Sequence, residues 1–106
     1  MADQILLAIS TFPDAETANS VAEALVEEKL AACANLIPAI HSIYRWKEKI
    51  ETAGEVMVFL KTTEDRLVEL QEKLRSVHPY EVPELICIKI DKGSPDYLRW
   101  VIDNCR

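Results

Sequence analysis

The stretch ILLAI at residues 5–9 is an unbroken run of apolar side chains near the start of the chain. Two further runs, VMVFL at residues 56–60 and LICI at residues 85–88, are equally apolar. Short apolar runs that are rich in β-branched residues are typical of buried strands. An antiparallel sheet with one covered face should instead alternate apolar and polar residues. Because these runs do not alternate, we expect both faces of their sheet to need cover.

The segments between these runs have the spacing of amphipathic helices. Apolar side chains recur every three or four residues from 15 to 29, and again from 67 to 77. Thr62 or Thr63 is a good N-cap for the second helix, and His78-Pro79 ends it. Ser94-Pro95 predicts the start of a short C-terminal helix.

Four strands are predicted, at residues 4–11, 30–46, 50–62 and 85–90. Pro38 indicates a bulge or a sheet edge, and residues 47–49 form a charged turn that closes a long hairpin. The order β-α-β-β-α-β with an extra C-terminal helix is that of a ferredoxin-like α+β fold. Right-handed crossovers would place both main helices on one face of the sheet. The C-terminal helix is too short to cover the other face, so we expect a homo-oligomer.

Composition restricts the class of protein. A chain of 106 residues is the size of a single domain, which we assign to residues 1–106. The net charge of −6 disfavours binding to nucleic acid. No apolar run approaches the roughly 20 residues of a membrane span, and no signal peptide is evident. The three cysteines do not show a paired spacing, which is typical of free thiols in the reducing cytoplasm. We expect Cys33 and Cys87 to be buried as apolar residues and Cys105 to be exposed.

The segment HPYEVPE at residues 78–84 is the most unusual for chemistry. Two prolines stiffen a stretch that carries a histidine, a tyrosine and two carboxylates, which suits a binding site. An ordinary connection between a helix and a strand explains the segment equally well. His78 is the better candidate for a metal or proton role because histidine titrates near neutral pH. Lys61, at the end of an apolar strand, could bind an anionic ligand, but we favour an ion pair with Glu81 or Glu84.

The hairpin tip carries Tyr44, Arg45 and Trp46, and such side chains are enriched at protein interfaces. We therefore expect Trp46 to dock onto a neighbouring subunit. No Ser-His-Asp set, paired-carboxylate cleft or cofactor fingerprint can be recognised from spacing, so an enzyme is not predicted.

Five short segments, in the same order along the chain, together resemble the CutA divalent-cation tolerance family. They are LAACAN (30–35), SIYRW (42–46), Glu55 with Lys61-Thr62, the HPYE and Pro83-Glu84 pieces of 78–84, and YLRW (97–100). The resemblance implies a ferredoxin-like domain whose sheets pack together in a homotrimer similar to the PII signalling proteins. It also implies a role in tolerance of copper and other divalent metals, with no established enzymatic activity.

Two positions depart from the pattern of some family members. Those members have a cysteine at the end of the first strand and a second histidine before His-Pro-Tyr, where this chain has Ser10 and Val77. The metal that the resemblance implies is Cu²⁺ or another divalent cation, and only weak binding through His78 is expected here.

Three functions remain open at this point. The first is a trimeric metal-response protein that binds a divalent cation loosely around residues 78–84. The second is a PII-like sensor with a small-molecule pocket between subunits, lined by Trp46, Lys61, Tyr80, Glu81 and Glu84. The third is a very stable scaffold whose effect on metal tolerance is indirect.

Overall fold

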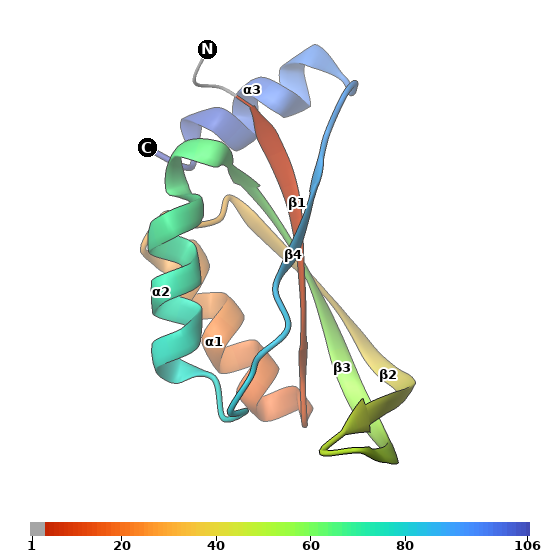
Figure 1. Ribbon diagram of the computed structural model, residues 1–106. Coiled ribbons are helices and arrows are strands. Elements are labelled where there is room, and N and C mark those ends of the chain that lie inside the picture. Colours follow the sequence, from red (N-terminus) through yellow and green to blue (C-terminus); the bar gives the residue numbers. More distant parts are fainter. Residues whose placement is uncertain (1–3) are drawn as a thin grey trace.

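The computed structural model describes residues 4–106, which form a four-stranded antiparallel sheet and three α-helices (Figure 1). The strands are β1 (Ile5–Phe12), β2 (Cys33–Trp46), β3 (Lys49–Thr63) and β4 (Ile86–Lys89). The helices are α1 (Ala15–Glu27), α2 (Leu67–Val77) and α3 (Pro95–Asp103), and a 3-10 turn, η1 (Glu64–Arg66), leads into α2. The strand order β2-β3-β1-β4 confirms the predicted ferredoxin-like arrangement.

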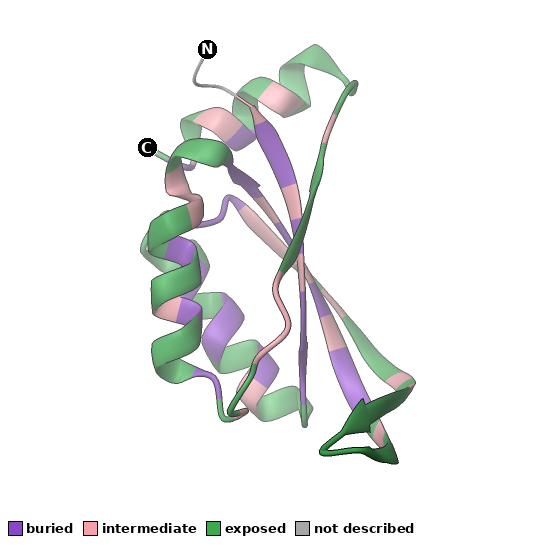
Figure 2. Ribbon diagram, in the orientation of Figure 1, coloured by how far each residue is buried: buried purple, intermediate pink, exposed green. Residues whose placement is uncertain are grey.

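Helices α1 and α2 lie together on one face of the sheet (Figure 1). The main core lies between them and that face, and it appears as the buried residues of Figure 2. From the sheet it takes Ala8, Phe12, Val56, Val58 and Leu60, and from the two helices Ala18, Val21, Ala22, Leu25, Leu70 and Leu74. Every second residue of the central strands therefore faces this core.

The opposite face of the sheet is open over most of its area in the single chain. Leu7 pairs with Ile88, and Ile9 pairs with Ile86, so these side chains share that face. Ile86 is 56% exposed and Ile88 is 51% exposed. Helix α3 covers only one end, where Ile5 joins Val101 and Cys105 in a small second core. The prediction that α3 is too short to cover this face is confirmed for the single chain.

The β2–β3 hairpin extends beyond the rest of the sheet and bends near its tip (Figure 1). Its register shifts between Ile37 and Ile40, so the bulge expected at Pro38 is confirmed. Lys47 and Glu48 have φ angles of 50° and 70°, which are the left-handed conformations that a two-residue hairpin turn requires. The charged turn is therefore shorter than predicted, and β3 already begins at Lys49.

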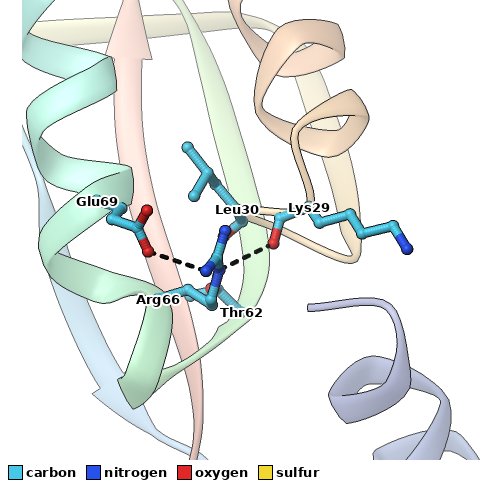
Figure 3. Close-up of polar contacts among 5 residues, drawn as sticks. All are labelled: Lys29, Leu30, Thr62, Arg66 and Glu69. Carbon is cyan, nitrogen blue, oxygen red and sulfur yellow. Dashed lines mark hydrogen bonds and ion pairs between the residues drawn. The ribbon is translucent and has the colours of Figure 1, made fainter. Parts of the chain in front are cut away.

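The end of α1 is tied to the end of β3 (Figure 3). Lys29 adopts a left-handed φ of 61°, and the Lys29 and Leu30 carbonyls then accept hydrogen bonds from β3 and η1. The Thr62 hydroxyl donates to the Leu30 carbonyl over 2.7 Å, and Arg66 Nε donates to the Lys29 carbonyl over 3.3 Å. Arg66 also forms an ion pair with Glu69 at 2.9 Å. Residues 30–32, predicted as the start of a strand, belong to this connection instead.

The predictions for the helix cap and for the cysteines were only partly correct. Thr63 holds the N-cap position of η1, but its side chain makes no capping hydrogen bond. Cys33, expected to be buried, is only half-buried, and Cys87 lies exposed on the edge strand β4. Cys105, expected to be exposed, is only 4% exposed because α3 folds back onto Ile5. Among residues 4–106, the helices lack the combination of length and apolar character needed to cross a membrane.

Candidate functional site

A cavity of about 640 Å³ opens between the β2–β3 hairpin, the end of β1 and the segment after α2. Its walls carry two kinds of side chain that are suited to recognition. The carboxylates come from Glu55, Glu81 and Glu84, and the aromatic rings from Tyr44, Trp46 and Tyr80. We refer to this feature as the hairpin cavity.

Glu55 and Tyr80 form the polar centre of the hairpin cavity. The Tyr80 hydroxyl donates to Glu55 Oε2 over 2.6 Å, and Glu55 is only 9% exposed. The pKa of Tyr80 lies above its ordinary value, first because of burial and then because of the hydrogen bond and negative charge of Glu55. Tyr80 therefore remains a hydrogen-bond donor through the physiological pH range.

His78 holds the beginning of the 78–84 segment against β1. Its Nε2 lies 2.8 Å from the Thr11 carbonyl oxygen, and its Nδ1 accepts from the Tyr80 amide over 3.1 Å. Since Nδ1 is the acceptor, Nε2 carries the proton and donates to Thr11. The ring also stacks on Phe12 with centroids 4.4 Å apart, and the residue is 8% exposed. Both ring nitrogens are thus already hydrogen-bonded, and a metal ion at either would have to replace one of these bonds.

Four of the five predicted ligand-binding residues line the hairpin cavity together, namely Trp46, Tyr80, Glu81 and Glu84. Glu84 is further linked to β1 by a long hydrogen bond of 3.5 Å from the Thr11 hydroxyl. Lys61 is separate from this group. It pairs with Leu7 and Cys33 in the sheet, away from the β1 end at which Thr11 lies, and its ammonium donates to Asn35 Oδ1. Within residues 4–106 the salt bridges do not include Lys61, so the favoured ion pair with Glu81 or Glu84 was wrong.

The sequence matches a known family along almost its whole length. A model of the family described as CutA1 divalent ion tolerance protein matches residues 6–104. The chain belongs to the CutA1 family. The resemblance of the five short segments is thereby confirmed. The CutA family is not known to have catalytic activity, in agreement with the prediction that the chain is not an enzyme.

Individual relatives agree with this assignment. Protein CutA of Mus musculus is 50% identical over 94 residues, which are 89% of this chain and 53% of the mouse protein. The divalent-cation tolerance protein CutA of Thermus thermophilus is 42% identical over 94 residues, which are 89% of this chain and 91% of that protein. The chain therefore spans about half the length of the mouse relative and nearly all of the bacterial one.

Solved structures share the fold. The crystal structure of CutA1 from Oryza sativa has a TM-score of 0.95 at 35% identity, covering 99% of this chain and 96% of the rice chain. A CutA structure from Archaeoglobus fulgidus, which is described as periplasmic, has a TM-score of 0.93 at 31% identity and covers 96% of this chain and 99% of its own. The four-stranded sheet with three helices is therefore the CutA1 fold.

Two of the three positions expected to supply copper ligands, Ser10 and Val77, lack the expected donor atom in this CutA-family chain. Ser10 is fully buried on the helix-covered side of β1, and its Oγ has no hydrogen-bond partner within the described part of the chain. A hydroxyl is a harder ligand than a cysteine thiolate and suits copper less well. Val77 offers no donor atom, and His78 uses both nitrogens within the fold. Residues 4–106 contain no group of three or more His, Cys, Asp or Glu side chains placed to hold a metal ion. The side chains present therefore do not fit a tight copper site.

Sequence reasoning did not assign Glu55, Thr11 and Tyr44 to the site. Glu55 had two usable signals, since it belongs to a segment that resembles the CutA family and is a carboxylate directly before the apolar run 56–60. Its partner Tyr80 lies 25 residues away in the chain, and the bulge at Pro38 sets which β2 residues lie beside it. Neither relationship can be derived from spacing.

Proposed function

We propose that this chain is a divalent-cation tolerance protein that acts as a homotrimer. The observation that carries the proposal is the family match over residues 6–104. The relative from Thermus thermophilus, of which the chain covers 91%, is named a divalent-cation tolerance protein. The shared fold along nearly the whole chain supports a shared role.

The open face of the sheet supports the trimer. Leu7, Ile9, Met57 and Phe59 are only half-buried there, next to the more exposed Ile86 and Ile88 of β4. Water contact with such a patch is unfavourable by roughly 25 cal/mol per Å² of apolar surface. Patches of this kind mark interaction surfaces on soluble proteins. Packing the sheets of three copies together would cover all of these side chains at once.

Tight copper binding at His78 is not part of this proposal. A copper ion on Nδ1 or Nε2 would have to displace the Tyr80 amide or the Thr11 carbonyl, which hold the 78–84 segment in place. We propose that direct contact with Cu²⁺ is weak and that tolerance arises through the assembled protein. Calorimetric titration of Cu²⁺ into wild type and His78→Gln should give equally small heats. A strong heat in wild type that His78→Gln abolishes would contradict this view.

Growth under metal stress tests the function itself. The chain would be expressed in a bacterial strain that lacks its own CutA protein and is challenged with Cu²⁺. We expect growth to be restored relative to an empty vector. Unchanged sensitivity, with the protein present at a normal level and correctly assembled, would refute the role in divalent-cation tolerance.

A small-molecule sensor is the second candidate function, and the hairpin cavity favours it. The volume of about 640 Å³ falls within the range of small-molecule sites, and four of the predicted ligand residues line it. In the trimer a neighbouring subunit could close its open side. A ligand present at a hundred times its dissociation constant should stabilise the protein by about 2.7 kcal/mol, which thermal unfolding detects. A broad metabolite panel that produces no shift would count against the sensor.

For the compartment we propose the cytoplasm. Cys33, Cys87 and Cys105 are all free thiols, which a reducing environment preserves. A relative from Archaeoglobus fulgidus is described as periplasmic, so the compartment of this chain needs a direct test. Cell fractionation with an antibody against the chain would decide between the two.

A further inference from the structure

The hairpin cavity has an excess of negative charge. Its lining includes three carboxylates, while the other side chains that line it are neutral. Glu55 is the carboxylate that most favours a bound cation. It is 9% exposed, and it accepts its hydrogen bond from the neutral Tyr80 hydroxyl. The salt bridges formed within residues 4–106 do not involve Glu55. A buried carboxylate is costly unless a positive charge compensates it, so a cation would be favoured beside Glu55.

The aromatic rings indicate which kind of cation fits. In the single chain Tyr44 is 44% exposed and Trp46 is 37% exposed, and both rings line the cavity. The face of an aromatic ring attracts an ammonium group within about 6 Å of its centroid. The chain itself provides an example, because Lys47 Nζ lies 5.7 Å from the centre of the Trp46 ring.

The size of the site separates organic cations from bare metal ions. A volume of about 640 Å³ is far larger than a single ion with its ligands requires. Aromatic rings also bind alkylammonium groups well, whereas divalent metals prefer several converging oxygen, nitrogen or sulfur donors. The combination of rings, volume and one buried carboxylate is that of a site for an alkylammonium compound.

We propose that the hairpin cavity binds a small organic cation, an amine or quaternary ammonium compound, with Glu55 as its counter-charge and Tyr44 and Trp46 against its cationic group. This inference rests on the small-molecule function proposed above and adds the charge and chemical class of the ligand. The net charge of −6 on the chain would also attract such a ligand.

Calorimetry on the purified, assembled protein tests the proposal with choline as the probe. Its neutral isostere neohexanol, in which carbon replaces the nitrogen, has the same shape without the charge. We expect choline to bind at least about tenfold more tightly than neohexanol, as a desolvated cation–π contact of ordinary strength requires. Equal affinities would show a merely apolar pocket and would overturn the proposal.

Two variants locate the binding. Glu55→Gln removes the charge but keeps an oxygen that can accept from Tyr80, and Trp46→Leu removes a ring. Each should weaken choline binding by about tenfold or more. Glu51→Gln is the matched control, since Glu51 lies exposed on the same strand and does not line the cavity. Unchanged affinity in both cavity variants, with circular dichroism showing them folded, would overturn the assignment.

The outcomes also separate this inference from the proposed functions. An anion or nucleotide that binds at the cavity in place of choline would keep the sensor and refute the organic cation. Failure of the growth assay together with specific choline binding would refute metal tolerance and leave the cation site standing.

Discussion

Replacing Tyr80 with phenylalanine removes one hydroxyl from the wall of the hairpin cavity and keeps the ring. That hydroxyl donates over 2.6 Å to Glu55, which is 9% exposed. Hydrogen bonds to charged groups contribute about 1.5–3 kcal/mol, so the free energy of unfolding of Tyr80→Phe should fall by about 2 kcal/mol at neutral pH. Tyr97→Phe is the control, because Tyr97 is 42% exposed on α3 and stacks on Trp100. It should change the free energy of unfolding by less than about 0.5 kcal/mol.

Urea unfolding followed by circular dichroism, at one fixed protein concentration, measures both variants. The pH dependence provides a second check. The folded state holds the pKa of Tyr80 above its ordinary value of 10.0, so above that pH the unfolded chain releases a proton that the folded chain keeps. The advantage of wild type over Tyr80→Phe is therefore complete below pH 10 and should shrink as the pH rises further. Equal stability at neutral pH, or an advantage that grows in alkali, would refute the reasoning.

Two further measurements test contacts that hold the fold together. Thr62→Val deprives the Leu30 carbonyl of its buried donor and should lower the free energy of unfolding by about 1–3 kcal/mol in urea titrations, whereas Thr63→Val should have a smaller effect. If Thr62→Val lowered the free energy of unfolding no more than Thr63→Val, the hydrogen bond from Thr62 to the Leu30 carbonyl would not have the stabilising role given to it here. Cys105 should react much more slowly with a thiol reagent than Cys33, because it is 4% exposed and burial raises its pKa. Mass spectrometry after brief labelling would show this, and rapid modification of Cys105 in the folded protein would argue against the packing of α3.

Much of the fold could be predicted because it depends on local patterns. The apolar runs at 5–9 and 56–60 and the helical spacing at 15–29 each identify an element without reference to the rest of the chain. The order of these elements then leaves few possible topologies. The missing alternation along the strands also predicted correctly that the sheet has a second apolar face.

The predictions that were wrong concern contacts between residues that are distant in the sequence. His78 was expected to be available as a ligand, yet its ring meets the Thr11 carbonyl, 67 residues away in the chain. Cys105 was expected to be exposed, but the direction in which α3 returns to Ile5 buries it. The Lys61 ammonium met Asn35 on the neighbouring strand instead of a carboxylate. Such pairings follow from register and helix direction, which sequence spacing alone does not specify.

In the proposed homotrimer, two further copies of the chain cover the open face of the sheet. Multi-angle light scattering across a dilution series measures the mass directly. We expect wild type to have three times the 12.0 kDa mass of one chain. Ile88→Asp places a carboxylate on the open face and should reduce that mass, whereas Val68→Asp, on the exposed side of α2, should leave it unchanged. A wild-type mass of 12.0 kDa, or a trimer that Ile88→Asp does not disturb, would contradict the account.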